Sequence, residues 1–323
     1  MYSDTRIIIS MKTMIIYGRA VALDGMLVST SSKNTVPVLE TPRPASSPLK
    51  RAPAGSTDCH FHIFGPPERF PLSSSRAYTP SLGMDVECYS AIANKLGLDR
   101  MVAVQPTSYG TNHSCLLHAV ETFGRHRARA IAVIDENFTQ TDLRSLDEKG
   151  VCGARVNLVT RNGTPISQLK TVAQLIAPFG WHLQLYVDGS KLSHLAPTLM
   201  SLPVDIVIDH MGKIPSEKGV ASREFRALLR LLDSGKCWVK LCGYRCSKLG
   251  PPYEDIAEPA RTLITAAPER CVWGTDWPHP GMHGSLMPDD GKLLDLLFDW
   301  APDSGLVHRI LVDNPARLYR FKA

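Results

Sequence analysis

The chain has 323 residues, of which 44% are hydrophobic, and a formal charge of +5. This length is enough for one large domain of about 250 residues with an extension. The charge is uneven, because residues 1–55 hold seven lysines and arginines against three acids and the remainder is nearly neutral. The remainder also lacks a basic stripe interleaved with aromatic residues, so we expect no nucleic-acid partner.

The eight cysteines form no Cys-x-x-Cys pair, and several lie in or beside apolar runs. They indicate neither a zinc knuckle nor a disulfide framework. Reduced, buried thiols are typical of a reducing compartment, so a cytoplasmic location is expected. No apolar run approaches the ~20 residues that span a bilayer, so no membrane partner is expected either. The sequence leaves both a monomer and a homo-oligomer open.

Residues 29–56 are rich in serine and proline and poor in bulky apolar side chains. Such a segment buries too little apolar surface to offset the entropy lost when it becomes ordered. We therefore predict a flexible N-terminal extension and linker over residues 1–56. The folded domain is predicted to cover residues 57–323.

Short apolar runs rich in β-branched residues predict eight strands after this extension. In chain order they are residues 57–63, 101–105, 130–134, 152–158, 182–187, 205–210, 237–242 and 271–276. Apolar residues spaced three and four apart predict helices between most of these strands and after the last one. The predicted helices are residues 86–96, 115–123, 169–179, 224–232, 256–267, 293–300 and 314–319.

Strands that alternate with helices pair in parallel through right-handed crossovers. Eight such units match a (β/α)8 barrel, which typically has ~250 residues. The alternative is an open, doubly wound sheet, but no Gly-x-Gly-x-x-Gly turn follows the first predicted strand. We therefore predict an α/β protein with a single TIM-barrel domain.

Three of the predicted strands end in residues that can carry chemistry, where a barrel of this kind places its active site. His60 and His62 are two residues apart, so both imidazoles lie on one strand face. His210 ends the sixth strand, where a buried imidazole needs a partner or a role. Asp276 leaves the eighth strand into a proline-flanked loop. These residues predict a catalytic group, although paired core histidines are the alternative for the first two.

A second set of residues is cationic. Arg155 lies in the fourth predicted strand, Arg161 follows it, and Arg245 follows the seventh. Guanidinium groups bind carboxylates through two parallel hydrogen bonds, so three at one barrel mouth predict an anionic ligand. A single arginine could equally form a surface salt bridge. Further polar candidates for this site are Tyr78, Tyr186 and His279.

The same histidines and aspartate could bind one zinc ion. A two-metal site would need a bridging Lys or Glu from the middle strands, where this chain has Arg155 and Tyr186. A site with three arginines is already cationic, and imidazoles can polarise a carbonyl without a metal. The residue types therefore leave a single-metal site and a metal-free site open.

Four stretches of the chain resemble the 2-pyrone-4,6-dicarboxylate lactonases of the amidohydrolase superfamily. They are Asp58-Cys59-His60-Phe61-His62-Ile63-Phe64-Gly65-Pro66, Arg155-Val156-Asn157 with Arg161, Val207-Ile208-Asp209-His210-Met211-Gly212, and Trp273-Gly274-Thr275-Asp276-Trp277-Pro278-His279-Pro280. The resemblance extends over residues 57–320. The motifs of the first, sixth and eighth strands are shared across the wider subgroup, and the arginines are the more discriminating part.

The resemblance implies a barrel hydrolase that needs no metal or other cofactor and opens a planar dicarboxylate lactone. Asp276 would be the general base that activates water. The three histidines would polarise the lactone carbonyl and stabilise the oxyanion. The residues implied to hold the carboxylates are Arg155, Arg161, Arg245, Tyr78, Tyr186 and Thr107. A related lactone-isomerase branch carries Asn in place of Asp276, so the retained acid favours hydrolysis, to an oxalomesaconate-type open-chain acid in aromatic catabolism.

Three alternatives follow from the same residues. One is a metal-dependent hydrolase or decarboxylase that uses the same histidines and Asp276. Another is a lactonase for a sulfomuconolactone or a sugar-acid lactone, because arginine binds sulfonates and carboxylates almost equally. The third is an inactive barrel that serves as a binding protein. Against the third, the four residues of the predicted catalytic group are all intact.

Overall fold

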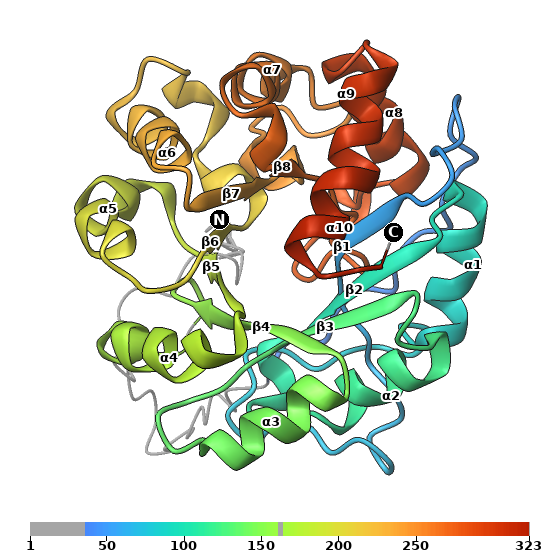
Figure 1. Cartoon of the computed structure of the whole chain (residues 1–323). Coiled ribbons are helices and arrows are strands. Elements are labelled where there is room, and N and C mark those ends of the chain that lie inside the picture. The colour runs from blue at the N-terminus through green and yellow to red at the C-terminus, as the bar shows by residue number, and fades with distance from the viewer. Residues whose placement is uncertain (1–35, 161–163, 323) are drawn as a thin grey trace, which may run out of the picture. The chain divides into compact units, whose positions relative to one another are not determined.

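The computed structural model describes residues 36–160 and 164–322. Within them, eight parallel strands pair in sequence order, β1 with β2 and so on to β7 with β8. Their bounds are β1 Thr57–Phe61, β2 Arg100–Val104, β3 Ala128–Ala132, β4 Val151–Asn157, β5 His182–Tyr186, β6 Ile206–Ile208, β7 Cys237–Lys240 and β8 Cys271–Val272. The predicted (β/α)8 barrel is confirmed (Figure 1).

The barrel closes between β1 and the segment that follows β8. The backbone N–H of Cys59 donates to the carbonyl of Trp273 at 2.9 Å, and the N–H of Asp276 donates to the carbonyl of His60 at 2.7 Å. A parallel bridge joins Phe61 to Trp277. This seam places the ends of the first and last strands side by side, so His60 and Asp276 become neighbours although they are far apart in the chain.

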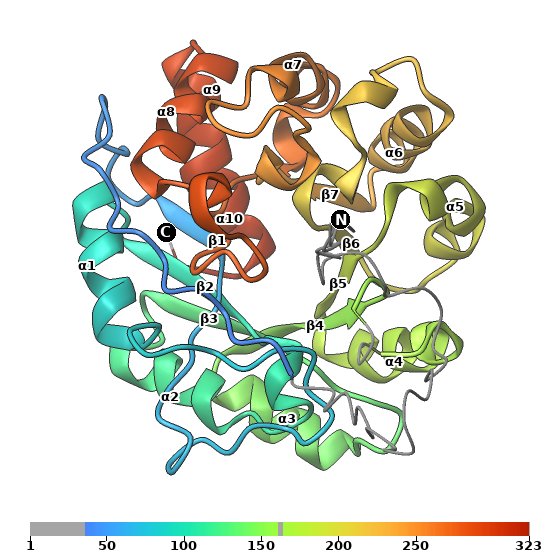
Figure 2. The same cartoon turned by 180° about the vertical axis from the view of Figure 1, so that it is seen from behind.

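Helices surround the strands in both views of the barrel (Figures 1 and 2). Their bounds are α1 Val86–Leu96, α2 Ser114–Phe123, α3 Gln140–Glu148, α4 Leu169–Ile176, α5 Leu192–Met200, α6 Arg223–Asp233, α7 Ala257–Ala266, α8 Asp290–Trp300, α9 Ser304–His308 and α10 Asn314–Leu318. Each predicted helix is present. Helices α3, α5 and α9 have weaker sequence signals and were not predicted, because α3 buries only Leu143 and Leu146, α5 contains Pro197 and α9 is five residues long.

Residues 36–56 make several contacts with the barrel. The N–H of Leu39 donates to the carbonyl of Thr79 at 2.8 Å, and the N–H of Ser46 donates to Asp289 at 2.8 Å. The side chains of Leu39, Ala45 and Ala52 are buried. The compact unit accordingly extends over residues 36–323. Residues 1–35 of the predicted extension lie outside the described residues, and the domain boundary at residue 57 stays a prediction.

None of the helices in the described part of the chain combines the length and the apolar composition that crossing a bilayer requires.

Candidate active site

A cavity opens at the carboxyl ends of the strands, where the polar residues were predicted to meet. It contains about 390 Å³ of space between atoms. The residues that line it are His62, Tyr78, Thr107, Arg155, Asn157, Thr160, Tyr186, His210, Arg245, Asp276 and Pro280. The lining comes from β4 and β5 and from the segments that follow β1, β2, β6, β7 and β8, so it exists only in the folded chain.

His60, His62, His210 and Asp276 form one cluster at this end of the barrel, here named the mouth cluster. The Nε2 atoms of His60 and His62 are 3.3 Å apart, and they lie 3.6 Å and 3.4 Å from Oδ1 of Asp276. Nδ1 of His210 lies 3.8 Å from Oδ2 of the same carboxylate. All four side chains are buried. The structure thus brings together the four residues of the predicted catalytic group.

The two oxygens of the Asp276 carboxylate have different surroundings. Oδ2 accepts hydrogen bonds from the Tyr244 hydroxyl and from Nε of Arg245, both at 2.5 Å. Oδ1 has no hydrogen-bond partner among the described residues. Burial raises the pKa of Asp276, but opposing interactions, chiefly with the Arg245 guanidinium, outweigh it and hold the pKa well below its ordinary value. Asp276 is therefore ionised, with one oxygen free to accept a proton.

The histidines of the cluster are neutral near pH 7. Burial lowers the pKa of His210 to about 4, although Asp276 and Asp209 oppose the shift. Burial also lowers the pKa of His62, and burial together with Lys240 lowers that of His60 well below its ordinary value. A neutral imidazole can donate from one nitrogen and accept at the other, so the position of its proton decides its role.

The position of the His62 proton follows from one contact. Its Nδ1 lies 2.7 Å from the backbone carbonyl of Val104, which can only accept a hydrogen bond. Nδ1 of His62 therefore carries the proton. Its Nε2, 3.4 Å from Asp276, then has a lone pair that faces the cavity.

The cationic residues are divided between two places. Arg155 lines the cavity from β4, where its NH1 donates to the carbonyl of Gln105 at 3.1 Å and its NH2 lies 3.7 Å from Asp209. Arg245 lines the cavity too, but its Nε is bonded to Asp276. The third predicted arginine, Arg161, lies outside the described residues. The neutral residues predicted to assist them, Tyr78, Tyr186 and Thr107, all line the cavity.

His279 is near the cavity without lining it. Its Nε2 lies 3.2 Å from Asp290 Oδ1, and its ring packs edge-on against Tyr244 at 5.4 Å. Its backbone N–H donates to the carbonyl of Asp276 at 2.8 Å. Both His279 and Asp276 have positive φ, near 61°. The structure therefore places His279 against Tyr244 and the Asp276 turn, where it can support residues that line the cavity.

Several further polar residues at this end of the barrel were not predicted. Asn157 and Thr160 line the cavity, and Tyr244 holds the Asp276 carboxylate. Beneath the mouth cluster lies a second set of fully buried side chains, Gln184, Asp209 and Lys240, here named the inner layer. Lys240 had a usable signal, because a lysine in the run Cys237-Trp238-Val239-Lys240-Leu241 puts a charge into a barrel strand.

The spacing of the mouth cluster also fits a metal ion. Zinc binds nitrogen and oxygen ligands at about 2.0–2.2 Å in a tetrahedron, which separates neighbouring ligand atoms by about 3.4 Å. Nε2 of His60, Nε2 of His62 and Oδ1 of Asp276 are 3.3–3.6 Å apart. These three atoms would hold the ion, which when bound would supply an acidified water.

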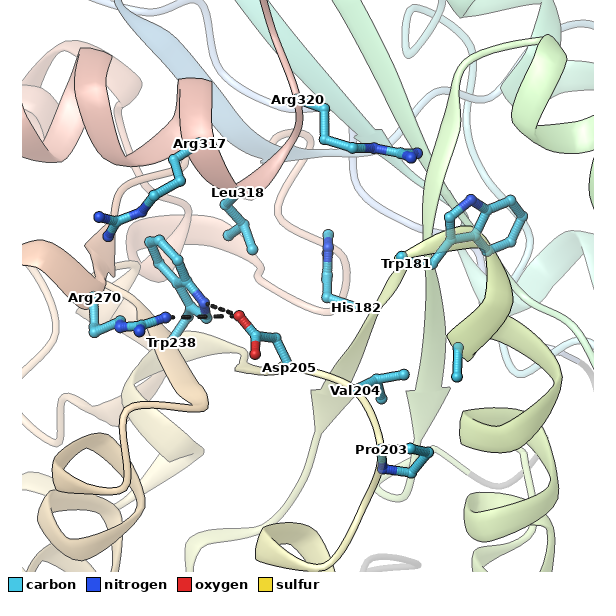
Figure 3. Close-up of a pocket in the computed structure, with 12 residues that line it drawn as sticks. Trp181, His182, Pro203, Val204, Asp205, Trp238, Arg270, Arg317, Leu318 and Arg320 are labelled. Atoms are coloured by element: carbon cyan, nitrogen blue, oxygen red, sulfur yellow. Dashed lines mark hydrogen bonds and ion pairs between the residues drawn. The ribbon is translucent and has the colours of Figure 1, made fainter.

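A larger hollow lies at the opposite, amino ends of β5 to β8, with about 840 Å³ of space; it is here named the base pocket. Figure 3 shows Arg270 and the Trp238 indole both joined to Asp205, at 3.6 Å and 3.0 Å. Arg317 stacks on Trp238 at 4.8 Å, and Arg320 pairs with Asp147 at 3.0 Å. None of the predicted site residues within the described ranges lies here, as expected for the end of a barrel that serves stability.

A closed (β/α)8 barrel with imidazoles and an ionised carboxylate at its carboxyl end has the architecture of an amidohydrolase-type enzyme. Comparison with known proteins agrees with this class. The family model described as Amidohydrolase matches residues 57–321. The chain therefore belongs to the amidohydrolase family, and the predicted family membership is confirmed.

Two curated relatives match most of the chain. A 2-pyrone-4,6-dicarboxylate hydrolase of Comamonas testosteroni is 37% identical over 85% of this chain and 93% of its own length. A 4-sulfomuconolactone hydrolase of Hydrogenophaga intermedia is 39% identical over 83% of this chain and 89% of its own length. Among solved structures, a probable 2-pyrone-4,6-dicarboxylic acid hydrolase of Acinetobacter baumannii, with citric acid bound, has a TM-score of 0.71 at 25% identity, covering 83% of this chain and 100% of that one.

Proposed function

We propose that this enzyme hydrolyses a small planar lactone that carries two acidic groups, with 2-pyrone-4,6-dicarboxylate as its substrate in the catabolism of aromatic compounds. The observation that carries the proposal is the free Oδ1 of ionised Asp276, which faces the imidazoles at the floor of a cavity that Arg155 lines. The two relatives named above act on acidic lactones by their descriptions. The Acinetobacter structure holds citric acid, a polycarboxylate.

Asp276 is the general base in the proposed reaction. Oδ1 takes a proton from water as the water oxygen attacks the lactone carbonyl, while Arg245 and Tyr244 keep Oδ2 in place. The carbonyl oxygen becomes an oxyanion, which donors of the mouth cluster stabilise. The ring C–O bond then breaks, and the proton from Asp276 passes to the leaving oxygen. General base catalysis contributes about 10²–10⁴-fold and an oxyanion donor about 10²–10³-fold.

Arg155 binds one acidic group of the substrate in this proposal. Its guanidinium is buried and its Nε has no partner among the described residues, so it can donate to a carboxylate. The guanidinium lies 5.7 Å from the centre of the Tyr186 ring, which orients it. Arg161, Arg245, Tyr78, Thr107 and His279 keep the binding or supporting roles predicted for them. The two charged ends of the substrate would thus set the lactone carbonyl over the mouth cluster.

We propose that the reaction needs no metal, because buried arginines and neutral imidazoles already supply positive charge and hydrogen-bond donors. The competing function is a metal-dependent hydrolase or decarboxylase, which the 3.3–3.6 Å spacing of the three donor atoms favours. Elemental analysis of purified enzyme, combined with activity before and after chelation, separates the two. Complete loss of activity that zinc or manganese restores would overturn the metal-free proposal.

Substrate choice is tested by a panel of lactones. Purified enzyme is mixed with 2-pyrone-4,6-dicarboxylate, 4-sulfomuconolactone and a sugar-acid lactone, and ring opening is followed by absorbance or by acid release. We expect the highest kcat/KM with the pyrone. Rapid turnover of the sulfonate with none of the pyrone would move the assignment to a sulfomuconolactone, and turnover of no lactone would sink the proposed function.

The cellular location, the partners and the oligomeric state of the enzyme are also part of the proposal. A cytoplasmic location is supported by its eight free cysteines, of which seven are buried. A small-molecule substrate is the only partner that the site requires. Size-exclusion chromatography with light scattering would distinguish a monomer from a homo-oligomer.

A further inference from the structure

The inner layer has no role in the mechanism described so far, although its charges are fully buried. Lys240 is the last residue of β7, and Asp209 follows β6. Both side chains have zero exposure. Burying a lysine costs several kcal/mol unless hydrogen bonds and an opposite charge compensate for the lost water. The position and partners of this lysine therefore indicate a function.

The Lys240 ammonium has three hydrogens and four neighbours. Nζ lies 2.7 Å from Oε1 of Gln184 and 2.8 Å from the backbone carbonyl of Cys59, so two hydrogens have short, well-placed acceptors. The third hydrogen has two candidates. Nδ1 of His60 lies 3.3 Å from Nζ, and Oδ1 of Asp209 lies 3.5 Å away.

His60 connects the inner layer to the mouth cluster. Its Nδ1 faces Lys240 and lies 3.3 Å from Oδ1 of Asp209, whereas its Nε2 faces His62 and Asp276. If Lys240 donates to Nδ1, the single proton of the neutral ring must lie on Nε2. If instead Nδ1 donates to Asp209, the proton is absent from Nε2. The two arrangements differ in what His60 offers to a substrate.

The neighbouring ring favours the first arrangement. His62 has its proton on Nδ1, bonded to Val104, so its Nε2 is an acceptor. Nε2 of His60 lies 3.3 Å from that acceptor. A proton on Nε2 of His60 makes this contact a hydrogen bond, whereas without it two lone pairs face each other. Lys240, His60 and His62 then form one continuous chain of donors and acceptors that ends at the Val104 carbonyl.

We propose that Lys240 is a positioning residue that holds the proton of His60 on Nε2, the nitrogen that faces His62 and Asp276 in the mouth cluster. This inference rests on the proposed function and deepens it, because it names His60 as the oxyanion donor of the mouth cluster. Asp209 balances the charge, through Lys240 at 3.5 Å and Arg155 at 3.7 Å.

The proton position is measured directly by NMR. The full chain is labelled with ¹⁵N-histidine, and the ring nitrogen signals of His60 are assigned by their loss in His60→Gln. We expect a neutral ring with its proton on Nε2 at pH 7. A wild-type ring protonated on Nδ1 would overturn the proposal. This measurement needs no substrate, so it succeeds or fails independently of the lactone assays.

Substitution tests the cause. In Lys240→Met, His60 loses its donor and we expect its proton to move to Nδ1, where Asp209 accepts it. The expected kcat loss is about 10²–10³-fold, the effect of removing one oxyanion donor, with KM changed less than about threefold. Lys236→Met is the matched control, because Lys236 is exposed and immediately precedes the same strand. A Lys240→Met ring that keeps its proton on Nε2 contradicts the proposal.

A second variant covers the case in which Lys240→Met does not fold. Asp209→Asn removes the competing carboxylate and keeps the lysine. If Lys240 sets the tautomer, His60 keeps its proton on Nε2 in this variant. If the proton of His60 leaves Nε2 when only Asp209 is changed, the carboxylate sets the ring and the proposal is wrong.

Discussion

The two ends of the barrel contain similar side chains in different arrangements. Each has histidine, aspartate, arginine and aromatic residues around a hollow, and the hollow of the base pocket is the larger one. At the base, Asp205 is engaged by Trp238 and Arg270, and Arg320 is paired with Asp147. At the mouth, Asp276 keeps one oxygen without a partner.

The difference shows that residue types and cavity size do not locate a reaction centre. A charged group whose hydrogen bonds are all formed within the protein contributes to stability. A buried acceptor atom that lacks a partner can instead accept a hydrogen bond from a ligand. His182 at the base is neutral and partnerless at Nε2 as well, but no carboxylate faces it within hydrogen-bond distance among the described residues. The combination of an ionised carboxylate with neutral imidazoles occurs at the mouth.

The largest expected effect is the loss of kcat on substitution of Asp276, compared with Asp205 in the base pocket. Asp276→Asn removes the general base, and we expect kcat to fall by at least about 10³-fold. Asp205→Asn is the control at the base, where the side chain is 44% exposed, and its kcat/KM should stay within about twofold of wild type. Steady-state assays of both variants check this. Comparable losses in the two would show that the ends do not divide function as described.

The second largest expected effect is a rise in KM on substitution of an arginine at the mouth of the barrel. Arg155→Met removes a charged hydrogen-bond donor to the substrate, worth about 1.5–3 kcal/mol, so KM should rise by about 10- to 100-fold. Arg317→Met changes a partly stacked arginine of the base pocket and should leave KM unchanged. The assay compares KM for the dicarboxylate lactone in both variants. An unchanged KM in Arg155→Met would remove this arginine from the binding site.

Acid should destabilise both ends through their buried histidines. The pKa is lowered by burial from 6.5 to about 4 in His210 and to about 3 in His182. Between these values and 6.5 the unfolded chain binds more protons, so the free energy of unfolding falls as pH decreases through this window. Each linked proton contributes about 1.4 kcal/mol per pH unit.

Urea unfolding at pH 7 and pH 5 measures this slope. His182→Gln should reduce the slope while kcat/KM at pH 7 stays near wild type, which separates the base histidine from the mouth histidines. An equal slope in His182→Gln and wild type would contradict the assignment of a buried, neutral imidazole at the base.

The smallest expected effect concerns stability alone. Trp238→Phe removes the hydrogen bond from the indole to Asp205, which is 3.0 Å long, and reduces the surface on which Arg270 and Arg317 stack. We expect a loss of about 1–2 kcal/mol in the free energy of unfolding with kcat unchanged. Thermal unfolding and a standard assay check both. A reduced kcat would link the base pocket to the reaction.

Local sequence signals predicted much of the fold for identifiable reasons. Helix α1 has its predicted bounds because Asp85 caps its first turn and Gly97 ends it in a left-handed conformation. Helix α5 was missed because Pro197 lies inside it, although Leu192 and Leu195 still pack against the barrel. Tertiary packing outweighed the local signal there.

The candidate site was predicted in outline, since a barrel gathers the ends of all its strands at one rim. His60, His62, His210 and Asp276 each lie at such an end, so topology alone placed them together. Their partners were not predictable. The contact of Arg245 with Asp276, where a substrate-binding role had been predicted, depends on the turn that follows β7.

The sequence by itself determined the number and order of the strands and the chemistry available at the strand ends, because hydrophobic periodicity and residue type are local properties. Only the tertiary structure decided which partner each polar side-chain atom contacts. Lys240 and His60 lie in two different strands and Asp209 follows a third, so their contacts depend on side-chain directions across the barrel. Those directions are set by packing between residues that are distant in the chain, which no local pattern records.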